Sequence, residues 1–187
     1  QKDKVLSKKA LVIGGSGFIG HHVIYNLLKE TDYEIISIDR LDYSGSYSRI
    51  QQIVEKNENW KKRVRVIWHD LKAEINPLTA NRINNPDVIL HLAAASHVDR
   101  SITDPMSFVL DNVVGTVNLL NYARGLKKLE KFVYFSTDEV FGPAPANIRY
   151  KEDDRYNSGN PYAASKAGAE EMCVAFKNTY NMPIIIT

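Results

Sequence analysis

Six short runs of apolar residues recur along this chain, and each run is continuous rather than alternating with polar residues. Continuous runs are typical of strands that are buried on both faces of a parallel sheet. Stretches with helical spacing lie between most of the runs, and this alternation predicts an α/β fold, a doubly wound parallel sheet with right-handed crossovers. The predicted strands are Ala10–Ile13, Ile35–Ile38, Val64–Ile67, Val88–Leu92, Phe132–Phe135 and Ile184–Ile186.

Three of the intervening stretches carry clear helix signals. An Asp-Pro pair at 104–105 and an Asn-Pro pair at 160–161 each supply a capping side chain followed by a first-turn proline. The predicted helices span residues 18–30, 105–127 and 161 to about 180. Residues 142–158 contain glycine, proline and mixed charges, and a connection of that length without regular structure predicts a functional loop rather than a linker.

The composition excludes several classes of protein. The 187 residues are 44% apolar with a net charge near +2, which suits one domain with a sizeable core and predicts neither nucleic acid nor a membrane as partner. No apolar run approaches the ~20 residues that a membrane span needs. The charged segment 1–9 has no signal-peptide pattern. The single cysteine, Cys173, excludes an internal disulfide and predicts a cytoplasmic protein in which this thiol is a buried hydrophobe.

A glycine-rich turn follows the first strand and opens the first helix. Gly14 permits the tight turn, Gly17 permits close approach to a pyrophosphate, and Gly20 permits close helix–strand packing. The helix N-terminus would then present free N–H groups to phosphates. The turn predicts a Rossmann-like dinucleotide site. The alternative is a plain strand–turn–helix connection.

A carboxylate stands at the end of the second strand, where a ribose-binding acid is expected. Asp39 would accept hydrogen bonds from the ribose hydroxyls and repel a 2′-phosphate, which favours NAD over NADP. The neighbouring Arg40 weakens that preference, because a guanidinium attracts phosphate. Asp70, at the end of the third strand, is placed near the adenine. An exposed strand-end aspartate is the alternative for Asp39.

A tyrosine and a lysine stand four residues apart near the start of the last predicted helix. At this spacing Tyr162 and Lys166 share one helix face. A lysine ammonium beside the phenol would lower the tyrosine pKa from its ordinary ~10 and make the group a usable base. The same lysine can hold the nicotinamide ribose. The alternative is an amphipathic surface pair.

These residues, together with "LHLAAASHVDRSI", "DNVVGT", "STDEVFG" and "NPYAASKA", resemble the extended short-chain dehydrogenase/reductase family, above all its nucleotide-sugar 4,6-dehydratases of the dTDP-glucose type. The resemblance covers the chain from Ala10 to Thr187. It implies tightly bound NAD, a nucleoside-diphosphate hexose linked to UDP or dTDP, and a smaller substrate domain beyond Thr187, so that 1–187 is the NAD-binding domain of a longer protein. The cofactor-binding residues that it implies are Gly14, Gly17, Phe18, Ile19, Gly20, Asp39, Arg40, Asp70, Leu71, Leu92, Ala93, Ala94, Tyr162 and Lys166.

The resemblance also gives roles to the polar residues after the fifth strand. Tyr162 takes the proton from the sugar 4-hydroxyl, and Thr137 positions that oxygen. Glu139 removes the C5 proton, and Asp138 protonates the departing 6-hydroxyl, so burial should raise the pKa of Asp138. Lys166 completes the catalytic set. The alternative for Ser136–Glu139 is a capping box, although glycine and proline follow almost at once.

The loop after the fourth strand departs from the dTDP-glucose pattern. Members of that group carry Glu where this chain has Ala95, which leads to the hypothesis that the sugar is a 2-acetamido hexose. Ser96 and His97 are predicted to contact the substrate from this loop, with a structural histidine as the alternative for His97. His91 lies in a strand and is predicted to belong to the core. The five histidines show no metal-ligand spacing, and no metal is predicted.

Two rival functions stay open. A nucleotide-sugar 4-epimerase shares the glycine turn and the Tyr–Lys pair, but it has no use for an acid–base pair directed at C5 and C6. A nucleotide-binding module without catalysis is the second rival. By analogy with the family, the helices over 105–127 and 161–180 are predicted to pair with those of a second copy in a four-helix bundle, which would make a homodimer.

Overall fold

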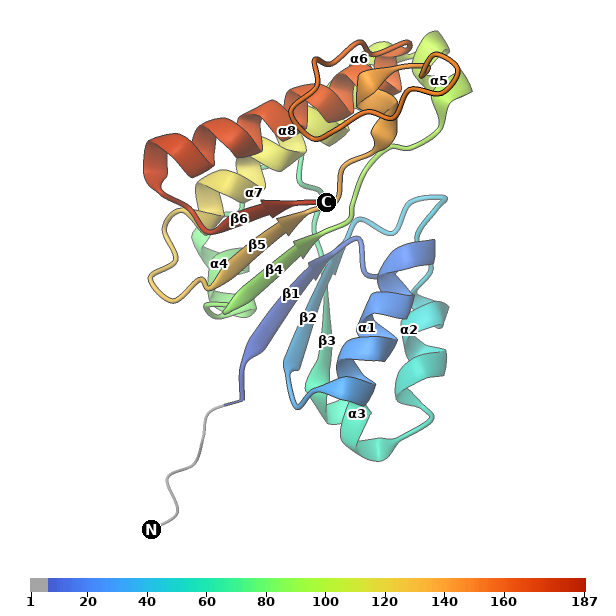
Figure 1. The fold of residues 1–187 in the computed structure, drawn as a ribbon. Helices are drawn as coiled ribbons and strands as arrows, with labels where there is room; N and C mark the ends of the chain where they lie inside the picture. Colours follow the sequence, from blue (N-terminus) through green and yellow to red (C-terminus); the bar gives the residue numbers. More distant parts are fainter. Residues whose placement is uncertain (1–6) are drawn as a thin grey trace.

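The computed structural model describes residues 7–187, so most of the charged segment 1–9 lies outside the described residues. Six parallel strands form one sheet in the order β3-β2-β1-β4-β5-β6, which confirms the predicted doubly wound α/β fold (Figure 1). The strands are β1 Lys9–Ile13, β2 Glu34–Asp39, β3 Val64–Trp68, β4 Val88–His91, β5 Lys131–Tyr134 and β6 Ile184–Ile186. Each agrees with its predicted range to within one residue at either end.

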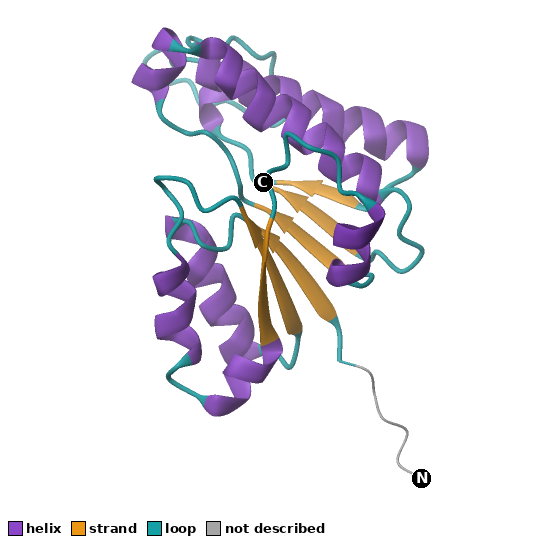
Figure 2. Ribbon diagram, turned by 180° about the vertical axis from the view of Figure 1, so that it is seen from behind, coloured by secondary structure: helices purple, strands orange, loops and turns teal. Residues whose placement is uncertain are grey.

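Helices cover both faces of the sheet (Figures 1 and 2). One side carries α1, α2 and α3, and the other carries α4, α7 and α8, while α5 and α6 lie near the start of α8. Their bounds are α1 Phe18–Glu30, α2 Tyr47–Val54, α3 Glu58–Arg63, α4 Pro77–Ile83, α5 Val98–Thr103, α6 Pro105–Phe108, α7 Gly115–Ala123 and α8 Pro161–Tyr180, with a π-helical segment η1 Val109–Val114 and a 3₁₀ helix η2 Asp138–Phe141.

The helix predicted over 105–127 is a composite. A π-helical segment, η1, separates α6 from α7, and α7 ends at Ala123 rather than near 127. Gly125 follows soon after this end, as glycine commonly does where helices stop. Residues 142–158 contain no helix or strand, as predicted. The Asn160 side chain accepts a hydrogen bond from the Ala163 backbone N–H at 2.8 Å, so the predicted cap of α8 is confirmed.

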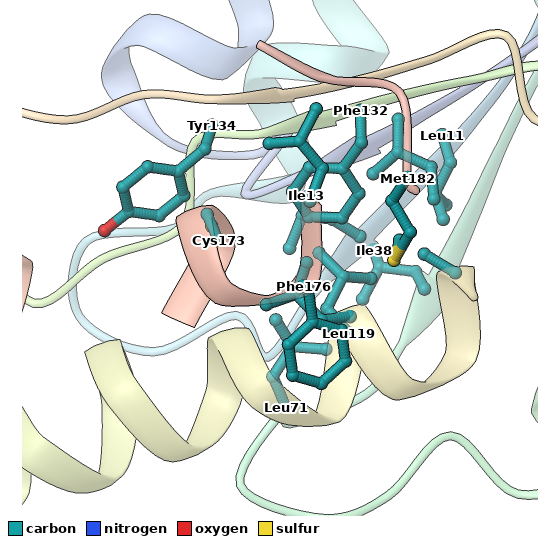
Figure 3. Close-up of a cluster of buried hydrophobic side chains, with 14 of the residues drawn as sticks. Leu11, Ile13, Ile38, Leu71, Leu119, Phe132, Tyr134, Cys173, Phe176 and Met182 are labelled. Carbon is teal, nitrogen blue, oxygen red and sulfur yellow. The ribbon is translucent and has the colours of Figure 1, made fainter. Parts of the chain in front are cut away.

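Alternate residues of the central strand enter two separate cores. Leu11 and Ile13 pack with residues of α7 and α8, whereas Val12 packs with α1 and α2 on the opposite face. Figure 3 shows the first of these cores, where Cys173 and Phe176 of α8 lie beside strand residues. Cys173 is fully buried, as predicted. Because both faces are covered, the strands read as continuous apolar runs.

We expect Tyr122→Phe to raise the free energy of unfolding at pH 7 by up to about 1 kcal/mol, because the buried Tyr122 hydroxyl has no hydrogen-bond partner among the described residues. Burial raises the pKa of Tyr122 from 10 to about 12. The unfolded chain therefore loses this proton first, so titration of this group leaves the free energy of unfolding unchanged below pH 10 and lowers it as the pH rises toward 12. Urea unfolding from pH 7 to 11 should show a shallower alkaline decline in the variant. An equal decline in both proteins would contradict this account.

Candidate functional site

A cleft of about 420 Å³ opens at the carboxyl ends of the strands, beside the point where the strand order reverses between β1 and β4. All the residues that the sequence assigned to the cofactor line this one cleft. They are Gly14, Gly17, Phe18, Ile19, Gly20, Asp39, Arg40, Asp70, Leu71, Leu92, Ala93, Ala94, Tyr162 and Lys166, with Ala95 and Ser96 beside them. The geometry brings these residues together, and their binding roles remain predictions.

The glycine turn depends on two positions. Gly14 has a φ of +82°, which side chains rarely tolerate, and a Cβ there would lie 2.9 Å from the Ala93 backbone nitrogen. A Cβ on Gly20 would lie 2.0 Å from the Gly14 carbonyl oxygen, so Gly20 allows the helix to start directly against the turn. Gly17 stands at the N-cap of α1, and no side chain among residues 7–187 caps this end. The first backbone N–H groups of α1 are therefore suited to phosphate oxygens.

Asp39 is fixed by the turn beside it. Its carboxylate accepts hydrogen bonds from the backbone N–H groups of Ser16 at 3.1 Å and Leu41 at 2.8 Å. The neighbouring Arg40 points its guanidinium to Asp111 and Asp42 instead. The hydrogen bond to Asp111 raises the pKa of Arg40, so this residue carries its positive charge inside an ion-pair network.

Lys166 is 4% exposed and lies at the floor of the cleft. Its ammonium donates a hydrogen bond to the Phe135 carbonyl oxygen at 2.5 Å and sits 4.3 Å from the centre of the Tyr134 ring. Burial lowers the pKa of Lys166 to about 8. The lysine is thus tied to the end of β5 by its head group.

Tyr162 is half-buried, and burial raises its pKa, while the nearby Thr137 side chain acts in the opposite direction. The prediction that Lys166 lowers this pKa is wrong for this structure. The reason is that the lysine ammonium is engaged with the Phe135 carbonyl at the end of β5. Thr137 is instead the group that favours the phenolate.

The residues after β5 form the short helix η2. The Thr137 hydroxyl caps it by accepting a hydrogen bond from the Glu139 N–H at 3.3 Å. The capping box predicted as the alternative is therefore wrong by one residue, because the Ser136 hydroxyl donates to the Glu170 carboxylate instead. The Glu139 carboxylate accepts a hydrogen bond from the Asn160 side chain at 3.0 Å, which links η2 to the start of α8.

Asp138 and Glu139 lie outside the dinucleotide cleft. They line a second cavity of about 350 Å³ with Gly142, Pro143, Gly159 and Asn160. Both carboxylates are exposed, so the expected burial of Asp138 is wrong for residues 7–187, where nothing covers the open side of η2. Tyr162 lines the cleft. The charges of Glu139 and Asp138, which line the second cavity, contribute to its raised pKa.

Sequence reasoning missed two polar residues that hold the site together. The buried Asn112 side chain accepts a hydrogen bond from the Ala95 N–H at 2.8 Å and donates to the Ala95 carbonyl at 3.0 Å and the Ser165 hydroxyl at 2.8 Å. It thereby fastens the loop after β4 to α8. Glu170 is the second, and its carboxylate accepts hydrogen bonds from Ser136 and from Tyr156 of the long loop. Its position four residues after Lys166 was the available signal.

The three remaining candidates near β4 separate clearly. His91 is buried and exchanges a hydrogen bond of 2.9 Å with the Thr116 hydroxyl, and burial lowers its pKa to about 3, which confirms it as a core residue. Ser96 lines the cleft. His97 is exposed at the start of α5 and is not among the residues that line either cavity in the described part of the chain.

Among residues 7–187, no group of three or more His, Cys, Asp or Glu side chains is arranged to hold a metal ion. In the same residues no helix combines the length and the apolar character needed to cross a membrane.

Comparison with known proteins finds nucleotide-sugar 4,6-dehydratases among the relatives of this chain. The dTDP-glucose 4,6-dehydratase of Escherichia coli is 38% identical over 96% of this chain, and the dTDP-D-glucose 4,6-dehydratase of Mus musculus is 36% identical over 97%. These matches take up 53% and 49% of the two relatives, so the chain spans about half the length of the curated relatives it matches.

Solved structures agree. A dTDP-glucose 4,6-dehydratase from Streptomyces venezuelae with NAD bound has a TM-score of 0.85 and 34% identity, over 95% of this chain and 54% of its own. A UDP-Glc/GlcNAc 4-epimerase from Campylobacter jejuni has a TM-score of 0.82 and 27% identity, over 96% of this chain and 52% of its own. The family model described as GDP-mannose 4,6 dehydratase matches residues 11–187. The chain therefore belongs to that family, within the extended short-chain dehydrogenase/reductases that its sequence resembles.

Proposed function

We propose that this chain is the cofactor-binding and catalytic part of an NAD-dependent nucleoside-diphosphate-hexose 4,6-dehydratase. The observation that carries the proposal is the position of Tyr162. Its phenol lines the dinucleotide cleft, and the side chains of Thr137, Asp138 and Glu139 lie close enough to influence its pKa. A base for the sugar 4-hydroxyl and a pair of carboxylates for C5 and C6 therefore stand next to one another.

The cleft suits NAD. The uncapped start of α1 offers N–H groups to the pyrophosphate, and the Asp39 carboxylate, held by two backbone N–H groups, suits the ribose hydroxyls. The ammonium of Lys166 at the floor of the cleft suits the second ribose. NAD held there would supply a hydride acceptor for C4 of the sugar and, once reduced, a hydride donor for C6, so that turnover would consume no external reductant.

The protein moves the protons. Tyr162, as phenolate, takes the proton of the 4-hydroxyl, and the Thr137 hydroxyl holds the same oxygen. The resulting 4-ketone makes the C5 proton acidic, and Glu139 removes it. Asp138 gives a proton to the departing 6-hydroxyl, which leaves as water. A proton returned to C5 then balances the hydride delivered to C6, and the product is a 4-keto-6-deoxy sugar. General acid–base steps of this kind typically contribute ~10²–10⁴ in rate.

A 4-epimerase is the second candidate, because epimerases stand among the similar solved structures. It needs the Tyr162 base but has no proton to remove at C5. The adjacent Asp138 and Glu139, which line the second cavity and contribute to the raised pKa of Tyr162, favour the dehydratase.

The proposal extends to the hexose and to its nucleotide. Ala95 lines the cleft with a methyl group, where the resembling dTDP-glucose enzymes carry a carboxylate, and this supports a 2-acetamido hexose as substrate. The nucleotide, UDP or dTDP, would be held by a substrate domain beyond Thr187. We retain the cytoplasm as the proposed location, on the single-cysteine composition alone.

The proposal includes a homodimer. Apolar side chains of α6 and η1 are exposed, among them Met106, Val109 and Leu110. Pairing of the helices over 105–127 and 161–180 with those of a second copy, in a four-helix bundle, would cover them. Light scattering of the full-length protein at micromolar concentration would show twice the monomer mass, and a monomer would refute the dimer.

Mass spectrometry of reaction products tests the function. Full-length protein is incubated with dTDP-glucose, UDP-glucose and UDP-N-acetylglucosamine, and the expected product is lighter than its substrate by one water. A product of unchanged mass with an inverted 4-hydroxyl would establish the epimerase. A higher kcat/KM for glucose than for N-acetylglucosamine would refute the 2-acetamido hypothesis while leaving the dehydratase intact.

A further inference from the structure

Arg40 follows the ribose-binding Asp39 in the chain and lines the same cleft. Its guanidinium donates two parallel hydrogen bonds to the carboxylate of Asp111, at 2.7 and 2.8 Å. Its Nε donates a further hydrogen bond to Asp42 at 2.7 Å. A planar fork of this kind is the usual ligand for phosphate in proteins, and here carboxylates already occupy it.

Asp111 comes from a distant part of the chain. It lies in η1, 71 residues after Arg40, and its side chain is 11% exposed, whereas that of Arg40 is 30% exposed, so the carboxylate is the more withdrawn partner of the pair. Asp70 stands 3.8 Å from the same guanidinium, and Lys72 approaches both Asp70 at 3.4 Å and Asp111 at 3.9 Å. The cleft wall beside Asp39 therefore carries an excess of carboxylates.

We propose that Asp111 determines cofactor specificity, by holding Arg40 in a bidentate pair so that its guanidinium does not bind the 2′-phosphate of NADP. The inference rests on the proposed dinucleotide site and extends it. Asp39 repels the 2′-phosphate directly, whereas Asp111 acts on the cation that would otherwise attract it. Discrimination against NADP thus has two sources in this chain, one at the end of β2 and one in η1.

The test measures binding of NAD and NADP, separately, to full-length protein stripped of nucleotide, by titration calorimetry. Asp111→Ala removes the bidentate partner of Arg40 and leaves its bond to Asp42. The ratio of NADP affinity to NAD affinity should then rise about tenfold or more, the usual effect of a hydrogen bond to a charged group. The affinity for NAD should change little. In the double variant Arg40→Ala/Asp111→Ala this gain should disappear, because the cation that produces it is gone.

A matched control removes one negative charge elsewhere. Glu130→Ala deletes a carboxylate that pairs with Lys8 at the opposite end of the sheet from the cleft, and the affinity ratio should not move. Unfolding temperatures of all variants report on folding.

The outcomes distinguish a failure of the dinucleotide site from a failure of the proposed role of Asp111. Wild type that binds no NAD would overturn the dinucleotide site and this inference with it. NAD binding by wild type, with an unchanged affinity ratio in Asp111→Ala, would overturn the inference alone. A parallel loss of both affinities in Asp111→Ala would make the ion pair a purely structural tie and would also overturn it. A gain that persists in the double variant would show that Arg40 is not the group released.

Discussion

Replacing Tyr162 with Phe is expected to lower kcat of the full-length protein on its nucleotide-sugar by ~10²–10⁴-fold, the usual contribution of a general base. The phenol lines the dinucleotide cleft, and Thr137 of the neighbouring segment lies close enough to influence its pKa. Phe keeps the ring, which packs edge-on against Phe108 with centroids 6.4 Å apart. The loss should therefore fall on kcat and not on NAD affinity.

The pH dependence of kcat carries a second signature. Burial raises the pKa of Tyr162, and a base is active only when deprotonated, so wild-type kcat should rise as the pH increases through the neutral and mildly alkaline range. The residual activity of the variant should lack this rise. Tyr150→Phe is the matched control, because Tyr150 donates its hydroxyl hydrogen bond to Pro143 within the loop at 3.2 Å, and its kcat should stay near wild type. An activity of Tyr162→Phe within a few-fold of wild type would remove the tyrosine from the mechanism.

The parts of the site that sequence alone predicted depend on short-range constraints. Gly14 and Gly20 are required by the backbone of a four-residue turn and the helix start beside it, and such requirements are visible in the spacing itself. The strand ends are also predictable from the sequence. In a parallel sheet that is covered on both faces, each strand is a continuous apolar run, and polar residues appear where the strand ends. Asp39 is predictable because it ends the first strand that follows the glycine turn.

What the sequence did not predict depends on contacts between distant segments. The ammonium of Lys166 donates a hydrogen bond to the carbonyl of Phe135, 31 residues away. The pKa of Tyr162 is raised by burial and is not lowered as the sequence predicted. Arg40 and Asp111 meet only because η1 follows the cleft wall. The π-helical segment itself has no pattern distinct from that of an α-helix over six residues, so a single helix was the natural prediction.

The exposure of Asp138 follows the same rule. A carboxyl that must donate a proton is best placed away from water, yet η2 leaves Asp138 open beside the second cavity in residues 7–187. The proposed substrate domain and the hexose itself would be the groups that cover it. The packing of this domain alone therefore does not show the burial of a carboxyl that a second domain would cover.

Variants of the carboxylate pair should separate the two proton transfers at C5 and C6. Glu139→Gln is expected to lower dehydration by ~10²–10⁴-fold, because the amide cannot accept the C5 proton. The Asn160 side chain, which donates to Glu139 at 3.0 Å, can donate to the Gln oxygen as well, so the cap of α8 should survive. Asp138→Asn should lower dehydration to a similar extent for a different reason, because the amide cannot protonate the departing 6-hydroxyl.

Solvent deuterium distinguishes the two losses. In deuterated buffer, Glu139→Gln should introduce no label at C5 of the recovered substrate, whereas Asp138→Asn should introduce label there without releasing water, since its C5 base is intact. Glu152→Gln, in the exposed loop, serves as the charge-matched control and should behave as wild type. Rapid C5 exchange in Glu139→Gln would assign the C5 base to another residue. If both carboxylate variants dehydrated at the wild-type rate, η2 would be structural, and the proton transfers at C5 and C6 would belong to other residues.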